Sequence, residues 1–236
     1  MKAVILAGGR GTRLEPYTTI LPKPLLPVGD VPILDIVIRQ LVSHGFNEIT
    51  LAVGYLAELI MSYVGDGSRY GIKISYSKEK KPLGTAGPLA QIDGLDETFL
   101  VMNGDILTTL DYSKLIDFHK KMRGIATIAM RKRNVKIDFG VIEINNRNEL
   151  EDYTEKPTLH YLVSMGIYIF EPEVLKFIEP NQKLEFPDLV KKLINNKKKV
   201  FGYLSDDYWL DIGRHEDYER AQREFDSIKN SLIPRK

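Results

Sequence analysis

Cysteine is missing from this chain of 236 residues, which excludes disulfide bonds, thiolate metal sites and a cysteine nucleophile. The absence is compatible with a reducing cytoplasm, which is the location that we expect. Long apolar runs are missing too. The apolar run after Lys2 ends at Gly8, and no stretch of 18 apolar residues occurs elsewhere. We therefore expect neither a secretion signal nor a membrane span.

An excess of charge of one sign is also missing. The chain has 33 basic and 32 acidic residues and a net charge of +1, so no global field attracts nucleic acid or an anionic membrane. Any site for an anion must be local. With 43% hydrophobic residues the chain can bury a full core, and we expect a single domain over residues 1–236.

Two common phosphate-binding motifs are absent. The chain contains no Gly-Lys pair, which excludes a Walker A loop. A dinucleotide fingerprint needs a third glycine where this chain has Leu14, and an acidic residue near the end of the second strand. The strand-like run 48–53 ends in Val-Gly instead, so a hydride-transferring enzyme is disfavoured.

Glycine and basic residues gather after the first apolar run. The run 3–7 breaks into Gly8-Gly9-Arg10-Gly11-Thr12-Arg13 and is followed by Pro22-Lys23-Pro24. Glycines let the backbone approach an anion and turn N–H groups toward it, while Arg10, Arg13 and Lys23 add positive charge. The segment favours a site for a nucleoside triphosphate, although an ordinary turn with solvated arginines explains the glycines alone.

Strand-like and helix-like patterns alternate through the first half. They predict an α/β fold with a Rossmann-like, mostly parallel sheet and helices on both faces. A nucleotide-binding part covers about residues 1–112; a sugar-binding and C-terminal part with an inserted β-rich lobe covers about 113–236. The expected strands are 4–6, 49–53, 72–76, 99–102, 126–130, 140–144 and 166–170, and the expected helices are 33–43, 56–63, 86 onward, 113–122, 172–178, 186–195 and 215–229.

Two aspartates stand where strand-like runs end. Asp105 follows the buried run 99–102 through Asn-Gly, and Asp211 lies in Trp-Leu-Asp-Ile-Gly. Hard oxygen ligands suit Mg²⁺, which commonly takes one or two carboxylates together with phosphate oxygens and waters. Asp105 alone is also compatible with an Asx turn.

The segment from Gly8 through Pro22-Lys23-Pro24 to Leu34 resembles the N-terminal signature of the sugar-1-phosphate nucleotidylyltransferases over some thirty positions. Segment 82–89 is most similar to the mannose-1-phosphate guanylyltransferases. The resemblance implies that Arg13, Lys23 and Asp105 are catalytic and that Asp105 and Asp211 hold the metal. It implies that the nucleotide is bound by Leu6, Ala7, Gly8, Gly9, Gly11, Thr12, Glu79, Gly84 and Thr85.

The sugar side has its own pattern. Glu155-Lys156-Pro157 resembles the family motif in which Glu binds sugar hydroxyls and Lys contacts the sugar phosphate. Many relatives have Asn-Ala-Gly where this chain has Ser164-Met165-Gly166, so the sugar is not identified. A surface ion pair is the plain alternative. The expected sugar-phosphate residues are Gly140, Glu155, Lys156, Ser164 and Gly166.

Glu79 carries the expectation about the base. Relatives that use thymidine or uridine substrates tend to have Gln at this position. A carboxylate accepts both N1–H and N2–H of guanine, whereas an imide base offers one N–H between carbonyls. GTP is therefore the expected triphosphate, unless Glu79 only neutralises its lysine neighbours Lys78, Lys80 and Lys81.

The expected reaction joins a nucleoside monophosphate from GTP to a mannose-like or heptose 1-phosphate, with Mg²⁺ as cofactor. Uridylyl or thymidylyl transfer, cytidylyl transfer to a non-sugar phosphate, and a silent sensor of nucleotide sugars remain alternatives. A homodimer is compatible with the pattern. The resemblance extends to Gly213, and we expect no appended β-helix lobe.

Overall fold

The first strand, β1 (Lys2–Ala7), is buried on both faces and lies within a seven-stranded sheet. The computed structural model describes residues 1–79 and 81–233. Side chains from alternate positions of β1 enter two different apolar clusters, one on each side of the sheet. A continuous apolar run is what such a doubly covered strand requires.

The strand order in this sheet is β12-β8-β11-β6-β1-β4-β5. Neighbouring strands are parallel except at β11, which is antiparallel to both β6 and β8, so the expected mostly parallel sheet is confirmed. The bounds are β4 (Glu48–Val53), β5 (Lys73–Lys78), β6 (Phe99–Asn103), β8 (Ala126–Lys136), β11 (Thr158–Phe170) and β12 (Val200–Leu204).

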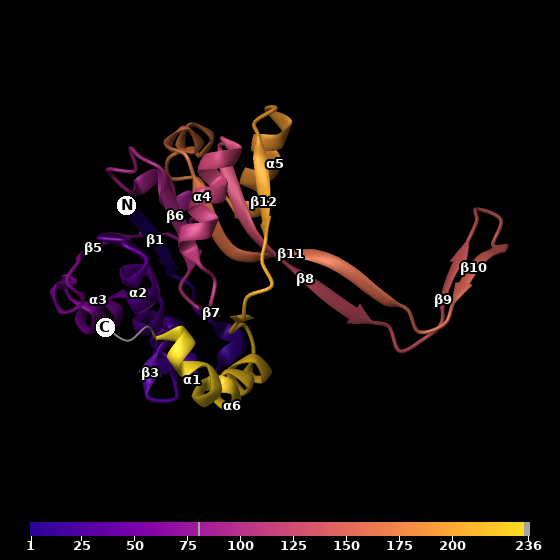
Figure 1. The fold of residues 1–236 in the computed structure, drawn as a ribbon, viewed down its shortest axis with the longest axis horizontal. Helices are drawn as coiled ribbons and strands as arrows, with labels where there is room; N and C mark the ends of the chain where they lie inside the picture. The colour runs from indigo at the N-terminus through magenta and orange to yellow at the C-terminus, as the bar shows by residue number, and fades with distance from the viewer. Residues whose placement is uncertain (80, 234–236) are drawn as a thin grey trace.

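Helices cover both faces, as expected (Figure 1). On one face the core includes α2 (Ile33–Ser43), α3 (Ala57–Val64) and α4 (Tyr112–Met122). On the other face it includes α5 (Phe186–Asn195). Smaller elements frame the carboxyl edge of the parallel strands: η1 (Thr12–Leu14), α1 (Tyr17–Ile20), η2 (Lys23–Leu25), β2 (Pro27–Val28), β3 (Val31–Pro32), β7 (Ile106–Thr108), β13 (Trp209–Asp211) and α6 (His215–Leu232). The short turn η3 (Ser68–Tyr70) instead leads into the amino end of β5.

Two expected helices are wrong in type. The segment after Ala86 forms a short 3-10 turn, η4 (Gly87–Gln91), and the segment after Glu171 forms another, η5 (Pro172–Phe177). The first residue of η5 is Pro172, and η4 begins with Gly87 followed by Pro88. Gly87 has low helix propensity and Asp93-Gly94 follows soon after, so too few residues remain for an α-helix.

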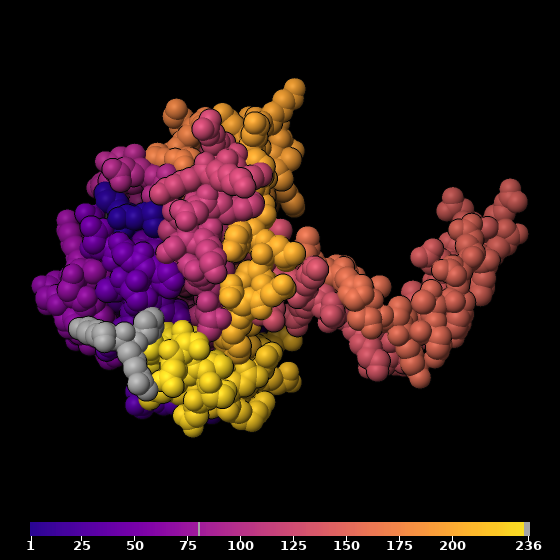
Figure 2. Space-filling model, in the orientation of Figure 1, coloured from indigo at the N-terminus to yellow at the C-terminus, as the bar shows by residue number. Residues whose placement is uncertain are grey.

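The inserted β-rich segment forms a long projection, which we call the arm (residues 131–163). Strands β8 and β11 leave the sheet as a two-stranded ribbon, and a hairpin of β9 (Val141–Ile144) and β10 (Leu150–Thr154) tips it. Figures 1 and 2 show the arm extending away from the body of the molecule.

Within the described residues, no helix is both long enough and apolar enough to cross a membrane.

Candidate active site

The glycine segment after β1 turns sharply against a neighbouring strand end. A Cβ on Gly8 would lie 3.3 Å from the Gly54 nitrogen, and the Tyr55 N–H donates to the Gly8 carbonyl at 3.1 Å. Gly11 has φ +65°, a left-handed conformation that favours glycine. Gly9 has open space where a Cβ would stand. The backbone is therefore exposed to whatever enters the adjoining cavity.

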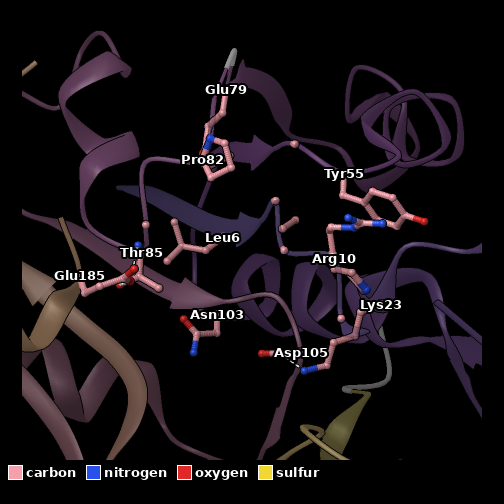
Figure 3. A pocket seen from close by; sticks show the side chains of 18 of the residues that line it. Leu6, Arg10, Lys23, Tyr55, Glu79, Pro82, Thr85, Asn103, Asp105 and Glu185 are labelled. Carbon is pink, nitrogen blue, oxygen red and sulfur yellow. Dashed lines mark hydrogen bonds and ion pairs between the residues drawn. The ribbon is translucent and has the colours of Figure 1, made fainter. Parts of the chain in front are cut away.

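A cavity of about 620 Å³ lies at the carboxyl ends of the parallel strands, where open α/β sheets bind ligands. Figure 3 shows Lys23 and Asp105 at one end and Thr85 and Glu185 at the other, with Leu6 between them. Most residues predicted for nucleotide binding and catalysis line it: Leu6, Ala7, Gly8, Gly9, Gly11, Arg13, Lys23, Glu79, Gly84, Thr85 and Asp105. Thr12 does not; it lies exposed in η1.

One end of the cavity carries opposed charges. Lys23 is buried, 8% exposed, and its ammonium group donates to Oδ2 of Asp105. The other carboxylate oxygen, Oδ1, is buried and finds no hydrogen-bond partner among the described residues. An unsatisfied buried acceptor costs about 1–3 kcal/mol, and more when charged. A cation or a hydrogen-bond donor bound to this oxygen would therefore remove that cost.

Asp211 lies close to Asp105, because β13 pairs with β7 and the Ile212 N–H donates to the Asp105 carbonyl at 3.1 Å. Loss of water around Asp211 and the neighbouring Asp105 charge raise the pKa of the Asp211 carboxyl above 3.8, while Lys23 and Arg13 lower it. The described residues contain no cluster of three or more His, Cys, Asp or Glu suited to a metal. Two carboxylates with one unpaired oxygen fit Mg²⁺ when phosphate oxygens complete its shell.

Two arginines of the glycine segment line the cavity, and the charge of Arg13 acts on Asp211. Arg13 is exposed in η1, and its guanidinium nitrogen lies 3.6 Å from the position of a Cβ on Gly213. The guanidinium of Arg10 lies 5.4 Å from the centroid of the Tyr55 ring, a cation–π distance that orients it along the cavity wall. Positive charge and open backbone thus meet at the carboxylate end, as a polyphosphate requires.

The opposite end is built from two carboxylates. Glu79 is half-buried, and its Oε2 accepts from the Leu83 N–H at 2.9 Å. Burial raises the pKa of Glu79 above 4.5; the hydrogen bond from Leu83 lowers it and the charge of Glu185 raises it. The alternative in which Glu79 neutralises Lys78 is not observed, because Lys78 pairs with Glu58. Lys80 lies outside the described residues.

Glu185 was not singled out from the sequence, although it lies at this same end. Its Oε2 accepts from both the N–H and the hydroxyl of Thr85, each at 3.0 Å. Burial acts to raise the pKa of Glu185, but these bonds and Lys183 hold it below the usual value. Asn103 and Tyr55 also line the cavity and were missed. Asn103 stands next to the Gly104-Asp105 pair and ends a buried strand, which is a signal that could have identified it.

The predicted sugar-phosphate residues fall into two groups. Gly166 is buried, with φ +72°, and a Cβ there would lie 2.7 Å from the Asn103 amide nitrogen. Ser164 is near, and its hydroxyl accepts from the Gly166 N–H at 3.2 Å. Gly140, Glu155 and Lys156 instead lie at the outer part of the arm, beside β9 and β10, and do not line the cavity. Lys156 lies 3.7 Å from Glu155, as in the surface ion pair considered above.

Together the sheet, the carboxyl-edge cavity and its charges define an α/β protein whose cavity is suited to a nucleotide. A family model described as nucleotidyl transferase matches residues 2–227, nearly the whole chain. The chain therefore belongs to the nucleotidyl transferase family.

Similar proteins of known name differ in the nucleotide base for which they are named. The chain is 37% identical over 256 residues to a UTP–glucose-1-phosphate uridylyltransferase of Synechocystis, covering 99% of this chain and 66% of that protein. It is 33% identical to a mannose-1-phosphate guanylyltransferase of Mycobacterium tuberculosis, covering 93% of this chain and 63% of that protein. The chain thus spans somewhat less than two thirds of the length of these curated relatives.

Solved structures share the fold. HddC from Yersinia pseudotuberculosis, complexed with GMP-PN, matches with a TM-score of 0.71 and 27% identity, covering 95% of this chain and 99% of that chain. A Bacillus anthracis protein assigned to the glucose-1-phosphate thymidylyltransferases, in complex with sucrose, matches with a TM-score of 0.77 and 25% identity, covering 94% of both chains.

Proposed function

We propose that the protein transfers a nucleoside monophosphate from GTP to a sugar 1-phosphate and releases pyrophosphate. The observation that carries this proposal is that the two ends of one cavity differ in their side chains. Its carboxylate end, with Lys23, Asp105 and the glycine segment, suits a triphosphate, and its other end, with Glu79 and Glu185, suits the hydrogen-bond donors of a base. A nucleotide placed along the cavity puts its α-phosphate near Asp105.

The chemistry asks for positioning and charge stabilisation. An oxygen of the sugar phosphate attacks the α-phosphorus in line, the bond to the β-phosphate oxygen breaks, and pyrophosphate leaves with the electron pair. No general base is needed, because a phosphate monoester is largely dianionic at neutral pH. Asp105 and Asp211 would hold Mg²⁺, which neutralises charge on the phosphates. Lys23 and Arg13 supply the protein's own positive charge there.

Guanine is the base that the cavity's charges favour. Both Glu79 and Glu185 are acceptors, and guanine presents two adjacent donors, N1–H and N2–H. One oxygen of Glu79 already accepts from Leu83, while Oε1 lies on the Gly8 side of the cavity, 3.4 Å from the position of a Cβ there. Uracil and thymine offer one N–H between two carbonyls, which two carboxylates repel.

The test is pyrophosphate release measured over a grid of GTP, UTP, dTTP, CTP and ATP against mannose, glucose, heptose and amino-sugar 1-phosphates. We expect turnover with GTP to exceed turnover with UTP and dTTP by about ten-fold or more, since each wrongly paired buried group costs about 1–3 kcal/mol. Reactions without sugar phosphate control for triphosphate hydrolysis. No transfer with any pair would refute the function, and preference for another triphosphate would refute guanylyl transfer alone.

Uridylyl transfer is the second candidate, because the Synechocystis relative at 37% identity is named as a uridylyltransferase. The same grid decides between the two. A silent sensor is disfavoured, because a sensor has no need of both Asp105 and Asp211. A cytoplasmic location stays a prediction.

A further inference from the structure

The arm exposes large apolar side chains to an unusual degree. A two-stranded ribbon has marginal stability in water unless a face is covered, and exposed apolar patches mark interaction surfaces. Most of the large apolar side chains that the described structure exposes belong to the arm: Val135, Phe139, Ile142, Ile144, Leu150, Tyr153, Leu159, Tyr161 and Leu162.

Both outer edges of the arm are also unpaired within the described residues. The neighbouring strand β12 pairs with β8 only as far as Met130, and β6 pairs with β11 only from Ile167. Beyond these points β8 and β11 pair with each other alone, up to Lys136 opposite Thr158. Unpaired strand edges are templates for pairing with another chain.

The arm separates the predicted sugar-phosphate residues. Its root lies at the cavity, where Gly166 packs against Asn103, while Glu155 and Lys156 lie beyond a ribbon whose paired length is about 20 Å at 3.4 Å per residue. The cavity therefore lacks, from its own chain, the lysine expected to hold the sugar phosphate.

We propose that two copies of this chain pair their arms side by side in antiparallel orientation, so that the tip of each arm completes the sugar-phosphate site of the other copy. A two-fold axis across the ribbons brings each tip to the partner's root. Lys156 and Glu155 of one copy then face Ser164 and Asn103 of the second. The inference rests on the proposed function for its chemistry, and on the arm alone for its geometry.

Charge along the arm matches this arrangement. The stem, residues 131–136, carries Arg131, Lys132, Arg133 and Lys136 and no acidic residue. The tip, residues 138–156, carries six acidic residues and two basic ones. In antiparallel pairing each acidic tip meets a basic stem, whereas parallel pairing opposes like charges. Such complementarity fixes the register of an interface.

The competing arrangement is closure of each arm onto its own body. It requires the ribbon of β8 and β11 to bend back toward the cavity. The register shift between Ser164 and Tyr168 is the place where the ribbon would bend. Closure within one chain builds every site from a single copy. Complementation between two defective chains therefore separates the two arrangements.

The first experiment co-expresses Asp105→Asn and Lys156→Ala chains with different tags and isolates the mixed dimer by both tags. One of its two sites then combines an intact body with an intact partner arm, so we expect about half of the parent activity per dimer. Each variant alone is expected to be nearly inactive when the sugar phosphate is kept well below the raised KM of Lys156→Ala. A mixed dimer as inactive as its parents, or failure to isolate one, overturns the proposal.

The second experiment needs no activity and separates failure of this inference from failure of the proposed function. The natural chain has no cysteine, so Glu151→Cys on the tip and Arg133→Cys on the stem give unique thiols. We expect a short bis-maleimide to join the two differently tagged variants when mixed. The body pair Glu219→Cys and Lys121→Cys, on α6 and α4, serves as the matched control and should not cross-link. Absence of the tip-to-stem product overturns the shared geometry even if transfer activity is found.

Discussion

The two carboxylate oxygens of Asp105 have different surroundings. One carboxylate oxygen fixes the buried ammonium of Lys23, and the other is buried without a partner among the described residues. A buried charge is tolerated when it is paired, and the ammonium group of Lys23 provides that pairing for Asp105. The unpaired oxygen, Oδ1, is then available to bind a cation. If both oxygens bonded Lys23, no oxygen of Asp105 would be available.

Replacement of either aspartate by asparagine tests the metal site. We expect Asp105→Asn and Asp211→Asn each to reduce kcat steeply, because an amide cannot neutralise a divalent cation, and we expect activity to require Mg²⁺ or Mn²⁺. Steady-state rates at several Mg²⁺ concentrations provide the measurement. Asp206→Asn, an exposed aspartate two residues after the end of β12, is the control. Full activity in excess chelator would remove both aspartates from metal binding.

Glu79 tests the choice of base. We expect Glu79→Gln to erode the preference for GTP over UTP and dTTP, because an amide rotates to offer both a donor and an acceptor. The measurement is kcat/KM for the three triphosphates in both proteins. Burial raises the pKa of Glu79, so its charged form is lost as the pH falls through a value above 4.5. KM for GTP should therefore rise toward acid pH in the parent and not in Glu79→Gln, and equal profiles would contradict the assignment.

Arg13 and Lys156 should affect different kinetic constants. Arg13→Ala should lower kcat by about 10²–10³, the usual cost of one preorganised donor to a transition state. Lys156→Ala should mainly raise KM for the sugar phosphate. Full kinetics in both substrates distinguish them, with Arg223→Ala, an exposed arginine on α6 away from the cavity, as the control. If Arg13→Ala loses affinity for GTP and keeps kcat, the glycine segment binds the triphosphate and does not stabilise the transition state.

Sequence motifs could identify Asp105 and Glu79, which follow strand ends, and Lys23, which lies in the Pro-Lys-Pro motif. The structure gathers these three residues in one cavity. Glu185 could not be found this way. It lies a hundred residues from Thr85 in the sequence, and the two are brought together where the N–H groups of Ala86 and Gly87 donate to the Leu184 carbonyl. Distances across the arm, which separate Lys156 from the cavity, were likewise beyond any local pattern.

Elements defined by a strong period were predicted well. Helix α2 begins and ends as expected at residues 33 and 43, because apolar residues repeat on its buried face. Strand β12 was missed, because its half-exposed sequence, residues 200–204, follows a lysine run and lacks a clear alternation. Its pairing with β8 comes from the tertiary fold, which overrides weak propensity.

The junction between α6 and the β2–β3 turn provides a test at the scale of elements. Gly29 has φ +59°, and a Cβ there would collide with the Phe225 ring. We expect Gly29→Ala to lower the free energy of unfolding by about 1–3 kcal/mol more than Gly45→Ala does. Gly45 has φ +82° with nothing within 4 Å, so it controls for backbone strain alone. Urea unfolding of both variants is the measurement. Equal decreases in the free energy of unfolding would show that the Phe225 side chain moves aside at little cost.

At the scale of the whole molecule, the arm stands apart from the two apolar clusters that hold the sheet. Its outer residues belong to neither cluster. Replacing residues 138–156 by a short Gly-Ser turn should therefore leave GTP binding and the melting temperature of the body almost unchanged. Transfer to sugar phosphate should be lost. Calorimetric titration and thermal melting measure this, and a large drop in melting temperature would show that the tip supports the core.

The chain enters and leaves the tip of the arm at one point, where the Ile137 N–H donates to the Pro157 carbonyl at 3.0 Å. A segment whose two ends are hydrogen-bonded neighbours behaves as a cassette, since its length and sequence can vary without moving the strands that carry it. Under the proposed function, exchange of residues 138–156 alone would change the acceptor sugar and leave the nucleotide half of the molecule unchanged.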